Sequence, residues 1–418
     1  MHVIVNRFIL FLAVSLSLTN ISFFSIGLAE FTIYYALLVL LLGYHLIVEP
    51  KSKRITVPKS LLILFLYIFF VNLVIAEEYK LSSFVYSIFI LCNIAIVYAI
   101  SNRLELSQIV RIAKWVILLF AISISIGYLL IRFNLSPDGL GLFLFQSYND
   151  GRQIRPMGLS SEPSYSAIIL VFTLYLLFKA SGFSFKQKDL IWYGASITSV
   201  FLTGSSYGYL LLAVLITFVA FKDRWIPKGI TCSISNPAIG IALILVIILL
   251  LSFFITSWNE RSLQRLVSIY VVLNEFGVNF WGAFLKIAYI DSSAGMRIVP
   301  SLQLIDYYIH ASYIPILFGH GAGQATVFYS SLWGQLTLVG FIPSFLYNYG
   351  LLGALLAYFC LIPFFPRRRL LLGFMFTLFL FNADLNTQIF VYILFIAMLC
   401  KRIDNLNERI PEAQPIAT

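Results

Sequence analysis

The sequence predicts an all-α, polytopic integral membrane protein with about twelve transmembrane helices. Of its 418 residues, 60% are hydrophobic and 11% are charged, whereas soluble globular domains carry roughly 25% charged residues. The mean hydropathy of the chain is +0.93. The apolar residues also gather in long runs, and one bilayer crossing needs about 20 of them in an α-helix.

The expected transmembrane segments follow one another along the whole chain. They lie at about 8–28, 31–48, 60–76, 81–100, 115–133, 164–179, 190–204, 207–221, 237–257, 339–365, 370–382 and 388–400. The last two are short for a full crossing, so we expect a tilted or shallow hairpin there. Gly27-Leu28-Ala29 resembles a signal-peptide cleavage site. Removal of the first segment, however, would invert every later loop and contradict the charge pattern.

The charges of the loops set the expected orientation. Cytoplasmic loops are enriched in Lys and Arg, and most of the 28 basic residues fall on one side if the N-terminus is inside. We therefore expect one membrane domain, 1–418, in the cytoplasmic (inner) membrane, with both termini and the tail 401–418 in the cytoplasm. Large external loops then cover about 134–163 and 258–338. The net charge of +10 follows from this topology and does not indicate nucleic-acid binding.

A minority of the basic residues is expected on the outer side, at or within the two external loops. These are Arg132, Arg152, Arg155, Arg261, Arg265, Lys286 and Arg297. One interpretation is ordinary solvated charge on two large loops. Positive charge there opposes the insertion bias, however, and as a set these residues favour an anionic ligand at the outer membrane surface.

The residues also argue against several classes of function. Cysteines and histidines match no zinc spacing, and no nucleotide-binding glycine loop or dinucleotide fingerprint occurs. The external loops contain no Asp-x-Asp pair for a divalent metal, so we expect neither a metal nor a cofactor. Apart from His45, no ionisable residue lies well inside an expected span. Ion-coupled transporters keep such residues in their spans, and this weighs against that class.

The first external loop carries the sequence Arg155-Pro-Met-Gly-Leu-Ser-Ser-Glu162-Pro163 directly before a span. Pro163 suits the first position of a helix. Glu162 precedes it and has two interpretations. Its carboxylate either caps the exposed amides of the following helix, or acts as a base or hydrogen-bond acceptor for a sugar hydroxyl at the membrane surface.

The second external loop is too apolar for a simple linker. Residues 260–276 have an amphipathic pattern with Arg261 and Arg265 on the polar face, typical of a helix at the membrane interface. A second helix is expected at about 300–312, with Pro300 in its first turn, and Asp306 and His310 share a face because they are four residues apart. Gly319-His320-Gly321-Ala-Gly323 follows. Its amides form either an anion-binding nest or a plain turn.

Five motifs in this order resemble those of the bacterial O-antigen and capsular polysaccharide polymerases (Wzy-type), which are related to the O-antigen ligases. They are Arg155-Pro-Met-Gly158 with Glu162-Pro163, Leu202-Thr-Gly-Ser205, Ser293-Ala-Gly-Met-Arg297, Leu317-Phe-Gly-His320-Gly and Asn348-Tyr-Gly350-Leu-Leu-Gly353. An arginine often follows the serine of the second motif in that family, and here Ser206 and Tyr207 follow instead. Another group must then hold phosphate at this motif, or the motif is only a tight turn between helices.

The resemblance implies a glycosyltransferase that moves a growing glycan from undecaprenyl pyrophosphate onto a hydroxyl of a lipid-linked repeat unit. Arginine offers a permanent charge and a two-pronged fork for phosphate oxygens, which suits Arg155 and Arg297. A base is needed for the acceptor hydroxyl, and the candidates are Glu162 and His320. Further expected substrate contacts come from Arg152, Arg261, Arg265, Asp306 and His310.

Two other functions stay open at this point. An O-antigen ligase would transfer the polymer to lipid A-core, and a flippase or exporter would move the same lipid-linked glycans across the membrane. Expected partners are the undecaprenyl-pyrophosphate-linked oligosaccharide, membrane lipid, and a chain-length regulator and flippase of the same pathway. The sequence does not distinguish O-antigen from capsule or exopolysaccharide as the product.

The topology is testable by cysteine labelling in intact cells with a membrane-impermeant reagent. In a background without the four native cysteines, we expect labelling of Asp150→Cys and Asp291→Cys and protection of Ser52→Cys, because positions 150 and 291 lie in the external loops. Labelling at position 52 with protection at 150 and 291 would show that the orientation is reversed.

Overall fold

The computed structural model describes residues 2–19, 22–26, 29–48, 58–76, 81–135, 147–149, 154–160, 162–183, 187–225, 292–333, 340–366, 370–380 and 388–408. Most of these residues are helical. The N-terminal part contains α1 (His2–Ser15), the strands β1 (Ser22–Ile26) and β2 (Ala29–Thr32), α2 (Ile33–Val48), α3 (Lys59–Phe70) with a π-helical turn (Val71–Ile75), α4 (Leu81–Ser101) and α5 (Leu106–Arg132).

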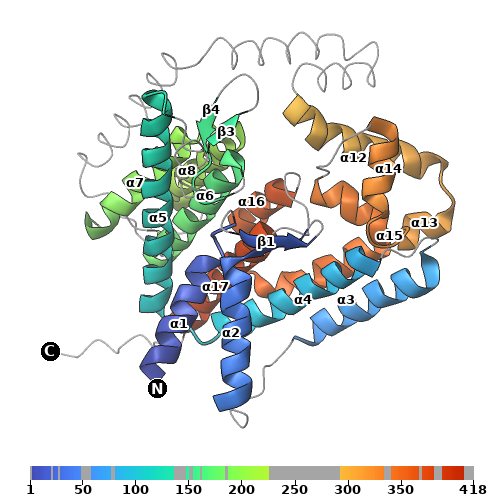
Figure 1. Cartoon of the computed structure of the whole chain (residues 1–418), viewed down its shortest axis with the longest axis horizontal. Coiled ribbons are helices and arrows are strands. Elements are labelled where there is room, and N and C mark those ends of the chain that lie inside the picture. Colours follow the sequence, from blue (N-terminus) through green and yellow to red (C-terminus); the bar gives the residue numbers. More distant parts are fainter. Residues whose placement is uncertain are drawn as a thin grey trace.

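The remaining elements begin within residues 134–163. They are the strands β3 (Ser147–Asn149) and β4 (Ile154–Pro156), then α6 (Pro163–Ala180), α7 (Leu190–Leu202), α8 (Ser206–Trp225), α12 (Ser292–His310), α13 (Tyr313–Phe318), α14 (Gln324–Trp333), α15 (Phe341–Leu361), α16 (Leu370–Leu380) and α17 (Gln388–Glu408). In Figure 1, α5–α8 lie on one side of the molecule and α3 with α12–α15 on the other, while α4, α16 and α17 lie between them.

The structure is mainly helical, as predicted, and its apolar helices are consistent with a membrane protein. Among the described residues, four helices are long and apolar enough to cross a bilayer: Ser83–Ser101, Leu106–Arg132, Pro163–Ala180 and Phe341–Phe364. Shorter apolar helices at Lys59–Ile75, Leu190–Leu202, Tyr207–Val219 and Leu370–Leu380 coincide with four more of the expected spans. The expected span 237–257 and the amphipathic segment 260–276 lie outside the described residues, and twelve crossings stay a prediction.

The first expected span, 8–28, is not one helix. Helix α1 ends at Ser15, and β1 and β2 then pair antiparallel, with Ile26 opposite Ala29. The hydroxyl groups of Ser15 and Ser17 donate to the carbonyls of Leu12 and Val14 at 2.8 and 2.7 Å. Serine and threonine compete in this way with helical hydrogen bonds. The helix therefore ends at the run Ser15-Leu-Ser-Leu-Thr19, although this run belongs to an apolar segment of the sequence.

The helices in the second expected loop, 258–338, differ from the expectation in two ways. Helix α12 begins at Ser292, so Pro300 lies inside the helix and not in its first turn. Proline removes one amide from the helix, but the helix continues because Leu304 is buried and the Pro300 carbonyl accepts the Tyr329 hydroxyl at 3.1 Å. Helix α14, from which Tyr329 comes, was not predicted.

Helix α17 forms the centre of the structure. Its residues from Gln388 to Cys400 are buried on all sides, as expected for a helix that is apolar all round. It packs against α4 and α6, and the hydroxyl groups of Thr173 and Tyr392 lie 2.6 Å apart between α6 and α17. Gln388 joins the start of α17 to the N-terminal elements through the Thr32 hydroxyl, 2.7 Å away, and the Leu16 carbonyl, 2.8 Å away.

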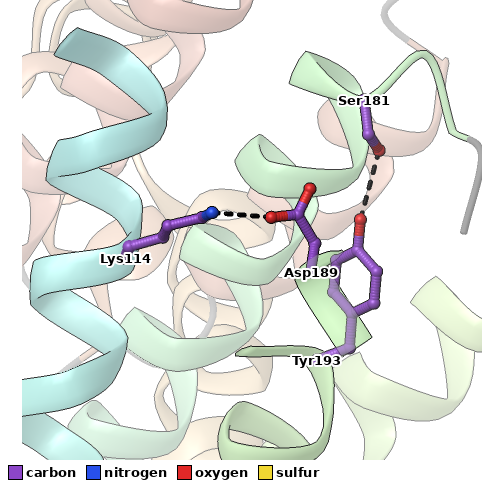
Figure 2. A network of polar contacts seen from close by, with 4 residues as sticks. All are labelled: Lys114, Ser181, Asp189 and Tyr193. Atoms are coloured by element: carbon purple, nitrogen blue, oxygen red, sulfur yellow. Dashed lines mark hydrogen bonds and ion pairs between the residues drawn. The ribbon is translucent and has the colours of Figure 1, made fainter. Parts of the chain in front are cut away.

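Ion pairs join helix ends that are predicted to be cytoplasmic from the loop charges. Lys114 of α5 lies 2.6 Å from Asp189, just before α7, and Tyr193 of α7 donates to the Ser181 hydroxyl at 3.3 Å (Figure 2). Lys179 at the end of α6 lies 2.6 Å from Asp404 of α17. These contacts bring segments that are far apart in the sequence to one end of the helices.

The Lys179–Asp404 pair is expected to stabilise the fold. The two side chains are 10% and 21% exposed, so Lys179→Met leaves a largely buried carboxylate without its cation and should cost about 1–3 kcal/mol. The free energy of unfolding in detergent measures this loss. A Lys179→Met/Asp404→Leu double variant should lose less than the sum of the two single variants. Additive losses would mean that the two charges are not coupled.

Candidate functional site

Arg155 is held at the turn between α7 and α8. It lies in β4, opposite Tyr148 of β3, and is half-buried. Its Nη1 donates to the Gly204 carbonyl at 3.4 Å, and its Cδ lies 3.2 Å from the place that a Cβ on Gly204 would take. Gly204 has a φ of +64°. Glycine therefore permits both the left-handed turn and the close approach of the arginine.

The turn Leu202-Thr-Gly-Ser205 is closed by its own side chains. Ser205 caps α8, because its Oγ accepts the Gly208 amide at 3.2 Å. The Thr203 hydroxyl accepts the Ser205 amide at 3.3 Å and donates to the Val200 carbonyl at 2.7 Å. The motif is thus a tight turn between helices, which was one of the two interpretations of the sequence. The first external loop places Arg155 against this turn.

Glu162 is the residue directly before α6, and Pro163 occupies the first helical position, as expected. The carboxylate does not cap the helix amides. Its Oε2 accepts the Ser164 hydroxyl at 2.9 Å, while the Glu162 carbonyl accepts the Ser160 hydroxyl at 2.7 Å. Glu162 is half-exposed. A carboxylate in this position is accessible from outside the helix bundle, as a base must be.

Met157 and Gly158, which follow Arg155, pack against α5 and α6. Gly158 has a φ of +70°, and a Cβ there would lie 2.9 Å from both Ile124 Cγ1 and Ser166 Oγ. The Ser166 hydroxyl also donates to the Met157 carbonyl. These contacts hold the backbone at Met157 and Gly158 against the two helices, close in the sequence to both the arginine and the glutamate.

His320 lies in a turn made of three left-handed glycines, Gly319, Gly321 and Gly323, with φ of +78°, +95° and +81°. The amides of this turn are already bonded inside the protein. Those of His320 and Gly321 donate to the carbonyls of Tyr347 and Asn348 at 3.1 and 2.8 Å. The turn is therefore no anion-binding nest; it is a turn that docks on α15.

Two asparagine side chains accept hydrogen bonds from amides in and just after the same turn. The Ala322 amide donates to Asn72 Oδ1, and the Ala325 amide donates to Asn348 Oδ1, both at 2.8 Å. Asn72 lies at the end of α3 and is buried. Asn348 is the first residue of the last motif, whereas Asn72 was not singled out from the sequence, although an amide side chain within an apolar run is itself a signal of a polar contact inside the membrane.

The docking site of the turn is a break in α15. Gly350 has φ +65° and ψ −175°, and this conformation removes the helical bonds that span it, from the amides 351–353 to the carbonyls 347–349. All three carbonyls have other donors: the amides of His320 and Gly321 and the Tyr67 hydroxyl, which bonds the Tyr349 carbonyl at 2.7 Å. Non-helical backbone at membrane depth is tolerated only where protein satisfies it.

Aromatic rings hold the His320 side chain. The imidazole stacks on Tyr347 with centroids 4.6 Å apart, and Tyr347 stacks on Phe328 at 4.4 Å. The Tyr307 hydroxyl lies 2.7 Å from His320 Nε2. The structure makes Tyr307 the hydrogen-bond partner of the candidate base.

Helix α12 carries three of the predicted site residues. Arg297 is its sixth residue, with a side chain outside the described part. Asp306 and His310 share an exposed face, as expected, and His310 Nδ1 lies 2.9 Å from the Asp306 carbonyl. The face toward His320 instead carries Tyr307 and Tyr308. Arg152, Arg261 and Arg265 lie outside the described residues.

Tyr308 links α12 to the helix before the break in α15. Its hydroxyl donates to the Leu346 carbonyl at 2.8 Å. Burial raises the pKa of Tyr308 above its ordinary value of 10.0, so the group stays protonated and remains a donor at physiological pH. Together, Tyr308, the glycine turn and Tyr67 bond four consecutive carbonyls of α15.

Comparisons of the chain with models of protein families, with curated proteins and with solved structures find no match. The geometry of the described residues must therefore carry the functional argument.

The contact between the glycine turn and the break is testable by glycine substitution. A Cβ on Gly319 would lie 2.4 Å from the Asn348 carbonyl carbon and oxygen, so Gly319→Ala combines left-handed strain with a backbone clash. Together these should destabilise the fold by on the order of 3 kcal/mol or more. The measurement is the thermal unfolding midpoint in detergent.

Gly373→Ala in α16 is the matched control, because nothing lies within 4 Å of the place that a Cβ on Gly373 would take and alanine is the better helix former. We expect the control to unfold at or above the wild-type midpoint. A wild-type midpoint for Gly319→Ala would contradict the close backbone contact.

Proposed function

We propose that the protein is a polysaccharide polymerase of the cytoplasmic membrane that uses an undecaprenyl-pyrophosphate-linked glycan as donor. One observation carries the proposal: four of the five motifs of the resemblance meet in two pairs. Arg155 of the first motif bonds Gly204 of the second, and the turn around His320 bonds Tyr347 and Asn348 at the last motif. These motifs, which are separate in the sequence, thus form two compact clusters.

The reaction needs positive charge near the leaving group. In the proposed step, the acceptor hydroxyl oxygen bonds the anomeric carbon of the donor, and the bond from that carbon to the pyrophosphate oxygen breaks. The carrier leaves as its pyrophosphate, and the hydroxyl proton passes to the base. Arg155 supplies the cation at the turn where Ser206 and Tyr207 replace the family's arginine, and its fork bonds phosphate oxygens. Arg297 is the second proposed cation.

The base is assigned to Glu162, which follows Arg155 closely in the sequence. His320, the other candidate, is bonded to α15 on the opposite side of the molecule from the α7–α8 turn that holds Arg155. Glu162 and Arg155 are seven residues apart in the sequence, and the carboxylate is half-exposed. His320 is held by Tyr307 and Tyr347, which suits a positioned imidazole but also a structural one. The substrate's isoprenoid chain needs an apolar surface, and an apolar cavity of about 410 Å³ lies between α15 and α16, lined by Phe345, Tyr358 and Phe376 among others.

Two other functions make different predictions for a deletion strain. Without a polymerase, the strain accumulates or displays single repeat units. Without a ligase, long polymers stay on the lipid carrier, and without a flippase the units stay on the cytoplasmic side. The lipid-linked glycan pool therefore distinguishes the three, and accumulation of long lipid-linked polymer would contradict the proposal.

Variants expressed in the deletion strain test the residues. Arg155→Ala and Arg297→Ala should each lower the polymerisation rate by about 10²–10³ while the protein stays inserted and abundant. Arg155→Lys keeps the charge but loses the fork, so it should also be impaired. Polymer length and amount on a gel are the measurement, and normal polymer from both alanine variants would refute the electrostatic role.

Glu162→Gln and His320→Ala divide the base role in the same assay. Loss of polymer in Glu162→Gln alone supports the assignment to Glu162, and loss in His320→Ala alone transfers the role to the histidine. Activity in both would return the two residues to structural roles. Arg111→Ala, on the expected cytoplasmic side, is a control for loss of a basic residue and should make normal polymer.

A further inference from the structure

The C-terminal half of α12 and the whole of α13 expose apolar side chains, although this segment lies outside every expected span. Ile309 is 70% exposed, Tyr313 85% and Ile314 61%. Helix α13 buries none of its residues. Adjacent exposed apolar residues on this scale mark a surface that contacts a membrane or another protein.

Helix α12 has three distinct faces over its last two turns. Leu304 and Tyr308 pack inward, toward α14 and α15. Ile305 and Ile309 form an exposed apolar face, while Asp306 and His310 form an exposed polar face. Helices with one face in protein, one apolar and one polar suit the side of a membrane protein at the membrane interface, where lipid and water meet.

The exposed apolar face continues the surface of α3, an apolar helix of the membrane core. Phe318, the last residue of α13, packs edge-on against Phe70 of α3 with ring centroids 6.2 Å apart. Leu73 and Val74, in the π-helical turn after α3, are 54% and 65% exposed. A face that continues the apolar surface of such a helix has the same surroundings, which are lipid.

The helix lengths show how deep in the membrane the glycine turn contacts α15. Gly350 is nine residues after Phe341, which is about 14 Å along the helix and near the middle of a hydrocarbon core about 30 Å thick. Helix α3 with its π-helical turn gives a second measure of this depth. Tyr67, which bonds the Tyr349 carbonyl, lies eight residues from both Lys59 and Ile75, about 12 Å from each end. Both helices put the break near the middle of the bilayer.

We propose that residues 305–323 form a re-entrant element immersed in one leaflet of the bilayer. Ile309, Ile314 and Leu317 contact lipid acyl chains, while Asp306 and His310 lie at the water boundary. The glycine turn descends between α3 and α15 to the break at Gly350. The assignment to the outer leaflet rests on the predicted orientation. Immersion itself rests on α3 and α15 crossing the bilayer, and not on the orientation or the proposed function.

Depth-dependent fluorescence quenching tests the element in the full-length protein. Single cysteines at Ile309, Ile314 and Leu317, in a background without native cysteines, carry an environment-sensitive fluorophore in phosphatidylethanolamine–phosphatidylglycerol vesicles. We expect strong quenching by lipids with a nitroxide on the upper acyl chain and weak quenching by aqueous iodide. Asp306→Cys and His310→Cys on the same helix are the matched controls and should show the opposite preference by several-fold.

Each outcome decides the proposal. Iodide quenching at 309 and 314 equal to that at 306 would place the segment in water and overturn it. Protection from both quenchers would mean that protein covers this face, either a second copy or another part of the chain, and would also overturn it. Folding of each labelled protein is checked by size-exclusion chromatography, and activity is not needed for the result, so the polymerase proposal can fail independently.

Discussion

The bonding of backbone carbonyls at the break in α15 is the constraint on which this half of the molecule depends. A carbonyl in hydrocarbon without a donor costs several kcal/mol, and the conformation of Gly350 deprives three consecutive carbonyls of their helical partners. The structure supplies donors from a loop far away in the chain and from α3. Because these donors come from different segments, the break is stable only when the segments are assembled around it.

The same bonds position the candidate base. The amides of His320 and Gly321 cannot bond α15 unless Gly319 lies against the backbone at Asn348, and in that position the imidazole stacks on Tyr347. The location of His320 is therefore a consequence of satisfying the broken helix. On the other side of the molecule, the left-handed Gly204 has a comparable role, since it lets Arg155 approach the turn between α7 and α8.

The apolar runs were sufficient to predict most helices, because length and hydropathy alone decide whether a helix can cross a bilayer. The start of α6 at Pro163 and the shared face of Asp306 and His310 also follow from local rules. The hairpin of β1 and β2 does not, since hydropathy does not register that Ser15 and Ser17 compete for helix carbonyls. Nor does the continuation of α12 through Pro300, which depends on tertiary packing.

The candidate site was predictable only in part, for a related reason. Arg155, Glu162 and His320 stand out as polar residues in motifs, but their partners are backbone groups and aromatic rings that carry no such signal. Tyr307, Tyr347 and Tyr67 are three of 24 tyrosines, and nothing local separates them from tyrosines of the membrane interface. Long-range contacts with the backbone select them, and such contacts appear only in three dimensions.

The central position of α17 has a consequence for biosynthesis. Helix α6 is almost fully buried and packs along α17, with Lys179 facing Asp404 and Thr173 facing Tyr392. The ribosome makes α17 long after α6, so during synthesis α6 first lacks the neighbour that covers one of its faces, and Lys179 lacks the aspartate. Docking of α17 between α4 and α6 therefore closes the bundle as a late, cooperative step of assembly, and a nascent chain that stops before it cannot complete this core.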